Sequence, residues 1–212
     1  MFCSCLLFFL SFFSLHLSSS AGPTLIYRKV FKSSSPEYVE IKVSRDGAAM
    51  VDIRQIDDEP APESFDVSRP LAEKLFGLAE QLNRFRGAQL DIHRRIANLG
   101  QKTFRFEDAG QAYETSFNYT TNPAANELML LFDGLARQQT HLQMIRHRMK
   151  YDRLGINDAL RHFDADLSRG AVAEPERLVP VLEAVAGDAR LVDIARQRAR
   201  ALIERIKAGG RE

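Results

Sequence analysis

Residues 123–151 form an unbroken helical pattern, and this stretch limits the folds open to the chain more than any other feature. Asn122-Pro123 combines an N-cap residue with the proline typical of a first helical turn, and no other proline follows before Tyr151. At about 1.5 Å per residue the helix would be roughly 40 Å long, so it would overhang a small sheet. Its far half therefore needs a partner.

A heptad pattern runs along this helix, with apolar or amide side chains on one face: Leu128, Leu135, Leu142 and Met149, with Leu131, Gln138 and Ile145 between them. The spacing predicts a coiled-coil-like seam of about three heptads. Residues 155–212 show three helical stripes and no strand pattern, so we expect an all-helical C-terminal region packed on the long helix. A homodimer or a protein partner bound through helix 123–151 is the alternative.

About five antiparallel strands are predicted between residues 24 and 119, because apolar and polar side chains alternate there. Asp46-Gly47 and Asp108-Ala109-Gly110 supply the residues that tight hairpin turns favour. An acidic, proline-containing loop follows the third strand. A helix over 68–83 then begins at Ser68, with Pro70 in its first turn.

The predicted fold is therefore α+β: an antiparallel sheet with two helices packed on it, followed by the helical C-terminal region. We divide the chain into a segment 1–21, an α+β domain 22–154 that ends in the long helix, and a helical region 155–212. Each half of the α+β domain runs strand, glycine turn, strand, capped helix, at a spacing of about 56 residues. A ββα duplication and chance similarity between two amphipathic helices both stay open.

The N-terminal segment has the composition of a secretory signal peptide. No Lys, Arg, Asp or Glu occurs from Met1 to Leu17, and small residues follow up to Ala21. This predicts cleavage after Ala21 and a periplasmic or secreted protein. The apolar run is shorter than the about twenty residues of a membrane-spanning helix. An uncleaved N-terminal membrane anchor is the alternative.

Both cysteines, Cys3 and Cys5, lie in that segment, so the mature chain would be cysteine-free. This excludes a disulfide, a thiolate nucleophile and a Cys-ligated metal from the mature protein. Lys and Arg number 29 against 28 Asp and Glu, which excludes a polycation that coats nucleic acid by net charge alone. We expect no nucleic-acid partner.

Adjacent carboxylates at Asp57, Asp58 and Glu59 are one candidate site. With His93 they could perform acid/base work, or hold a divalent cation for a metal-dependent hydrolase. The spacing of an EF-hand is absent, however, and acids before a helix also suit its dipole. We expect a solvated loop and keep the hydrolase as the alternative.

A second candidate is the helical triplet Asp158, His162 and Asp166, whose spacing of four could present imidazole and carboxylates to one cation. The same pattern is typical of a polar helix face. The chain contains no H-E-x-x-H motif, no G-x-S-x-G elbow and no glycine-rich phosphate loop. The sequence accordingly predicts no cofactor, no metal and no catalytic residue as its main interpretation.

Basic side chains gather in two stretches, which we treat as a candidate surface for an anion or a partner: Arg84, Arg86, Arg94 and Arg95, and then Arg146, Arg148 and Lys150. Cations at the end of a long helix also suit its dipole. An anionic envelope polymer or lipid headgroups would be the ligand.

Three stretches, IANLGQKTFRFE (96–107), YDRLGINDAL (151–160) and IARQRARALIERI (194–206), resemble in this order an uncharacterised family of exported bacterial proteins with no assigned activity. The resemblance implies export and shared architecture, and it transfers no site residues. Together these observations favour an exported, non-enzymatic protein that binds a partner or helps to assemble the envelope, through a helical and charge-segregated surface.

Overall fold

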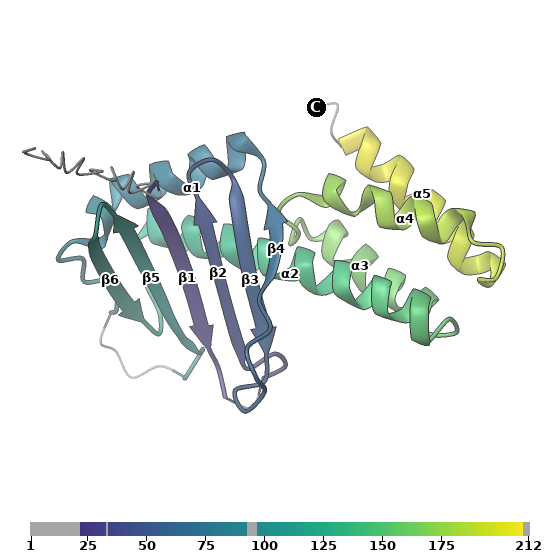
Figure 1. Ribbon diagram of the computed structural model, residues 1–212, viewed down its shortest axis with the longest axis horizontal. Coiled ribbons are helices and arrows are strands. Elements are labelled where there is room, and N and C mark those ends of the chain that lie inside the picture. The colour runs from purple at the N-terminus through teal and green to yellow at the C-terminus, as the bar shows by residue number, and fades with distance from the viewer. Residues whose placement is uncertain (1–21, 33, 93–96, 210–212) are drawn as a thin grey trace, which may run out of the picture.

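The structure, a computed structural model, describes residues 22–32, 34–92 and 97–209. They form one antiparallel sheet and two groups of helices (Figure 1). The strands are β1 (Thr24–Val30), β2 (Tyr38–Ser44), β3 (Ala48–Arg54), β4 (Glu63–Asp66), β5 (Gln101–Asp108) and β6 (Gln111–Phe117). The helices are α1 (Arg69–Gln81), α2 (Pro123–Tyr151), α3 (Ile156–Ser168), α4 (Val179–Gly187) and α5 (Asp193–Gly209), with 3₁₀ turns at Asn83–Phe85 and Pro175–Leu178.

The predicted α+β class is confirmed. The sheet has the order β4-β3-β2-β1-β5-β6, and Figure 1 shows α1 and α2 on one side of it. The other helices lie beyond the β4 edge. Whether the two ββα halves descend from a duplication stays a prediction.

The sixth strand, β4, lies inside the segment that the sequence predicted to be an acidic loop. It is four residues long, and Phe65 is its single apolar side chain. Phe65 pairs with Ala49 of β3, and Glu63 pairs with Val51. Such a short edge strand carries too little alternation to be recognised, because its pairing depends on β3 rather than on its own pattern.

Both predicted turns and both predicted helix starts are confirmed. Gly47 has a φ of +96° and directly precedes β3. Ala109 and Gly110, with φ of +47° and +78°, close the β5–β6 hairpin as a two-residue turn. The side chains of Ser68 and Asn122 cap α1 and α2 by accepting from backbone N–H groups three residues on.

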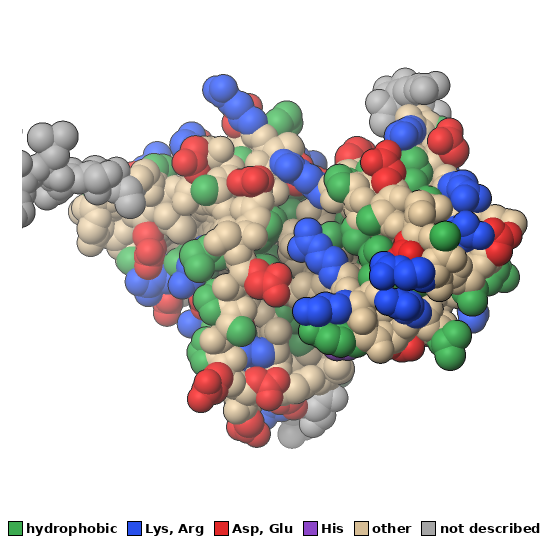
Figure 2. Space-filling view, turned by 45° about the vertical axis from the view of Figure 1, so that its right-hand side comes forward, with side chains coloured by type: hydrophobic (Ala, Val, Ile, Leu, Met, Phe, Trp, Pro, Cys, Tyr) green, Lys and Arg blue, Asp and Glu red, His purple; other side chains and the backbone are tan. Residues whose placement is uncertain are grey.

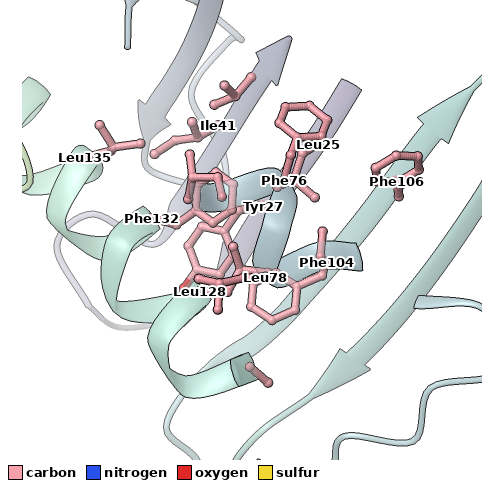
Figure 3. Close-up of a cluster of buried hydrophobic side chains, with 14 of the residues drawn as sticks. Leu25, Tyr27, Ile41, Phe76, Leu78, Phe104, Phe106, Leu128, Phe132 and Leu135 are labelled. Atoms are coloured by element: carbon pink, nitrogen blue, oxygen red, sulfur yellow. The ribbon is translucent and has the colours of Figure 1, made fainter. Parts of the chain in front are cut away.

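One face of the sheet carries the first hydrophobic core, against α1 and the first half of α2. Tyr27 of β1 stacks on Phe132 of α2, with ring centroids 5.1 Å apart, and Phe104 of β5 lies beside both rings (Figure 3). The opposite face displays alternating charges, with pairs such as Lys42–Glu40 and Arg105–Glu107. The sheet is therefore apolar on one side only, as the period of two predicts.

The second core is formed by the far half of α2 together with α3, α4 and α5. The predicted packing of the C-terminal region on the long helix is thus confirmed. The heptad positions divide between the two cores: Leu128 and Leu135 lie in the first, and Ile145 lies in the second. The seam is filled by the chain's own residues, so a homodimer through α2 stays a prediction that would need another face of the helix.

Hydrogen bonds of Glu174 connect the sheet-bound part with the helical region, where α1 and α2 meet the turn before α4. Glu174 is buried, and its carboxylate accepts a hydrogen bond from the backbone N–H of Ser68 at 3.0 Å. Its own backbone N–H donates to the side chain of Gln138 at 2.9 Å. Gln138 is the amide at a seam position, and this bond satisfies it inside the protein.

All the buried side chains of the two cores lie between Leu25 and Ile206. None of the helices in the described ranges is both long and apolar enough to cross a membrane. The predicted signal peptide, 1–21, lies outside the described residues. The division at residue 154 stays a prediction, and α2 contributes to the cores on both sides of it.

Candidate functional site

A cavity of about 280 Å³ lies where the sheet meets the helical region. The end of β1 and the loop after it form one wall, and α2 and α3 form the other. Its lining residues are Lys29, Phe31, Ser34, Ser35, Pro36, Glu37, Val39, Asp133, Ala136, Arg137, Thr140, His141 and Asp166. We call this the junction cavity.

Asp133 of α2 anchors one side of the junction cavity. Its carboxylate accepts from the buried hydroxyl of Tyr27 at 3.0 Å and from the ammonium of Lys29 at 3.2 Å. Burial first, and then the Asp133 charge and hydrogen bond, raise the pKa of Tyr27 well above its usual value. The phenol therefore stays a neutral donor to the carboxylate.

Lys29 lies directly opposite Lys102 on the core-facing side of β1 and β5. Like charges across a strand pair repel each other. Burial, followed by the nearby Lys29 charge, lowers the pKa of Lys102, while Asp133 acts in the opposite direction. The Lys102 ammonium donates to the carbonyls of Leu99 and Asn118 at 2.8 Å each. Asp133 therefore balances charge at a position where two lysines face each other.

His141 and Asp166 form the other side of the cavity. The Nε2 atom of the buried His141 lies 2.8 Å from Oδ2 of Asp166. Asp166 also accepts from Arg169 at 2.5 Å and lies 3.7 Å from the Arg137 guanidinium. Burial alone would raise the pKa of Asp166, but the hydrogen bonds from Arg169 and His141 and the nearby charges outweigh it, so the pKa is lowered.

Burial also decides the protonation of His141. Burial lowers the imidazole pKa from 6.5, and this effect outweighs the hydrogen bond and charge of Asp166, which raise the pKa. A neutral ring must donate from Nε2 to the carboxylate, which leaves Nδ1 as an acceptor. That Nδ1 atom is buried and has no hydrogen-bond partner among the described residues. The pair therefore joins α2 to α3 as a neutral imidazole hydrogen-bonded to a carboxylate.

The carboxylates Asp57, Asp58 and Glu59 are exposed in the turn that follows β3. Asp58 accepts from the backbone N–H of Gln55, a local turn contact. His93 lies outside the described residues, so the structure does not place it relative to these acids. The hydrolase built on these four residues stays a prediction.

The triplet Asp158, His162 and Asp166 is not brought together. Asp158 and His162 form an exposed pair at 3.4 Å, whereas Asp166 is turned inward to His141 of α2. Eight residues of helix rotate Asp166 away from Asp158 by about 80°. In the described ranges, no group of three or more His, Cys, Asp or Glu side chains is placed to hold a metal ion.

The basic candidates separate into two places. Arg84 lies near Glu80, Asp108 and the ring of Phe106, and Arg86 stacks over Tyr113 at 4.5 Å, beside the β5–β6 end of the sheet. Arg94 and Arg95 lie outside the described residues.

The other group, Arg146, Arg148 and Lys150, lies at the far end of α2 (Figure 1). Arg148 is paired with Asp152 at 2.9 Å, and the Lys150 ammonium lies over the ring of Tyr151. The length of α2 between the two groups means that they do not form one continuous surface.

Apart from Asp166, which belonged to the candidate metal triplet, the sequence did not predict the residues of the junction cavity as a site. A signal was present, because Lys29 occupies an inward position of β1 in line with Leu25 and Tyr27, where the alternation calls for an apolar residue. Asp133 likewise interrupts the apolar face of α2. These polar residues come from segments more than 100 positions apart, so only the fold could join them.

No protein-family model matches the chain. No curated protein is significantly similar to it in sequence.

Proposed function

We propose that the mature protein is an exported, non-enzymatic binding protein of the cell envelope, and that it docks on the anionic surface of a lipid bilayer. The docking surface is the outer end of the helical region, formed by residues 146–154 and 188–194. The observation that carries this proposal is the combination of exposed apolar and basic side chains at that end.

The apolar part of this outer end comes from the end of α2 with the turn after it, and from the start of α5. Leu154 is 84% exposed, Tyr151 is 66% exposed and Ile194 is 57% exposed. Both places lie at the end of the helical region farthest from the sheet in Figure 1. The Arg153 charge also lies near enough to Asp188 to help the Arg190 hydrogen bonds lower the pKa of that carboxyl to about 2. Large side chains exposed in one place are typical of an interaction surface.

The basic part of the outer end favours an anionic partner. Its two segments contain five Lys or Arg and three Asp or Glu. Arg146 makes no ion pair within the described part of the chain, and Lys150 is exposed. Figure 2 shows basic and hydrophobic side chains beside one another over the helical region. Tyrosine and leucine between cations suit the headgroup level of a bilayer, where rings and alkyl chains enter the interface.

Vesicle co-sedimentation tests this proposal with the chain that starts at Gly22. We expect binding to vesicles that contain phosphatidylglycerol, weaker binding at higher salt, and none to pure phosphatidylcholine. The double variant Tyr151→Ser, Leu154→Ser should lose the binding. Leu130→Ser is the matched control, because Leu130 is 64% exposed on the same helix but lies away from the outer end.

Binding that is equal on both vesicle types, absent from both, or retained by the double variant would reject the lipid surface. A dimer in solution that the double variant dissociates would instead identify the outer end as an interface between copies. Export is tested separately by the mass of the mature protein from the producing cell, which should begin at Gly22. A chain retained in the membrane at full mass would support the N-terminal anchor.

A further inference from the structure

We propose that the junction cavity binds an uncharged, polyhydroxylated small molecule of the size of a single sugar ring. This inference is independent of the lipid-binding surface, which lies at the opposite end of the helical region. It rests on the volume, the charge balance and the mixed lining of the cavity.

The volume sets the size of the ligand. At about 280 Å³ the cavity is slightly smaller than the sites of drug-sized molecules, which span about 300–1,000 Å³. It would hold on the order of nine waters at about 30 Å³ each. A single six-membered ring with its hydroxyl groups fits this space.

Charges of both signs line the cavity, and most of them have a partner in the protein. Lys29 is paired with Asp133, and Asp166 is held by Arg169 and His141. Glu37 accepts from the backbone N–H of Ile56 at 3.4 Å. An anion would lie beside the three carboxylates of the lining, and a cation would lie beside Lys29 and Arg137. Displacing a partner from either pair would leave the other partly buried and uncompensated, which is costly. An uncharged ligand avoids this penalty.

Donors and acceptors both remain available on the lining. The guanidinium of Arg137 has its nearest carboxylate oxygen at 3.7 Å, so its N–H groups are open to a ligand. The hydroxyl of Thr140 donates to the Ala136 carbonyl of its own helix, which leaves its oxygen free to accept. Lys29 retains one N–H beyond the two that face Asp133. Ligand hydroxyls can donate and accept, so they match this mixture.

The remaining wall is apolar. Phe31, Pro36 and Val39 come from the sheet side, and Ala136 comes from α2. Such a wall packs against the C–H groups of a ring whose hydroxyls turn toward the polar side. An acyclic polar anion would leave this wall without a partner.

A two-dimensional NMR titration of the chain that starts at Gly22 tests the proposal. The probes are glucose, galactose and N-acetylglucosamine, with alanine as a zwitterion and citrate as an anion. We expect saturable shifts with a sugar, concentrated on the amides of β1 and the middle of α2. Thr140→Leu should fill the cavity and weaken that binding by about tenfold or more. Gln143→Leu places the same side chain three residues on, outside the lining, and should bind like the parent protein.

Three results would overturn the proposal. The first is the absence of shifts with any sugar up to about 50 mM, a concentration at which a site of millimolar affinity is already filled. The others are saturation by alanine or citrate but not by a sugar, and unchanged sugar binding in Thr140→Leu. If circular dichroism shows that this variant does not fold, Arg137→Gln gives the same readout. Arg137 is half exposed and its loss leaves both cores intact.

Discussion

The carboxylate of Glu174 and the backbone N–H of Ser68 are hydrogen-bonded at 3.0 Å, although 106 residues separate them along the chain. Ser68 is the N-cap of α1, so the carboxylate lies at the positive end of that helix. Glu174 thereby fixes the turn before α4 against the sheet-bound part of the protein. This contact offers the most direct test of how the two cores are joined.

Replacing Glu174 with Ala should destabilise the protein by about 1–3 kcal/mol, because the partly buried backbone N–H of Ser68 loses its charged partner. Glu174→Gln keeps one acceptor oxygen and should lose less. The free energy of unfolding in urea measures both effects. Glu176→Ala is the control, since Glu176 is exposed on the same turn and should change stability by less than about 0.5 kcal/mol. Equal losses in the Glu174→Ala and Glu176→Ala variants would contradict the assigned role.

His141 should make stability depend on pH. Its pKa in the folded protein is below the value of 6.5 that it has when exposed, because burial disfavours the imidazolium. The unfolded chain therefore binds the proton more readily, so the stability is fully present above pH 6.5 and falls as the pH drops toward the folded pKa. The pKa of Asp166 is lowered from 3.8 in the folded protein, so its protonation should reduce the stability further as the pH falls below 3.8.

The imidazole resonances of His141 in an NMR titration give its pKa directly. Asp166→Asn removes the carboxylate that favours the charged ring and should lower the pKa further. His141→Gln should flatten the decline in unfolding free energy just below pH 6.5. A pKa of His141 above 6.5 in the parent protein would show that Asp166 outweighs burial.

Tyr27 should resist ionisation in the folded protein, since burial and Asp133 both raise its pKa. The variant Tyr27→Phe should therefore give the same tyrosinate absorbance as the parent up to about pH 11, as long as both remain folded. The variant should also be less stable by about 1 kcal/mol, because Asp133 loses one donor. A decrease in tyrosinate absorbance in the variant would mean that water reaches this phenol.

Two glycines should respond to alanine in opposite directions. At Gly47 the φ of +96° disfavours a side chain, and a Cβ would lie 2.6 Å from the carbonyl oxygen of Val67. Gly47→Ala should cost about 1–3 kcal/mol. Gly77 lies in α1 with no atom near its Cβ position, so Gly77→Ala should stabilise by up to about 1 kcal/mol. Thermal unfolding of the two variants measures the signs.

Much of the fold could be predicted because its determinants are local. The alternation around Ile41, the glycine of the Asp46-Gly47 turn and the caps Ser68 and Asn122 each act within a few residues. The strand β4 could not be predicted, because Phe65 gains its place only from pairing with Ala49.

The candidate site depends on contacts that no local pattern encodes. Asp166 was predicted to lie on an outer helix face beside His162, but its real partner is His141, 25 residues earlier on another helix. Lys29 and Asp133 meet only because β1 lies in the middle of the sheet and α2 crosses it. A charged residue at an inward strand position predicts that a partner exists, but it does not identify that partner.

The 29 residues of α2 belong to both cores, and this bears on how the protein can change over generations. Recombination exchanges modules most readily at linkers, where few contacts cross the boundary. Here the helical region and the sheet-bound half share one continuous helix, α2, which is about 43 Å long. A foreign helical region would have to match the seam around Ile145, and a chain that ended before α3 would expose it. The two halves are therefore expected to be inherited, lost and redesigned together.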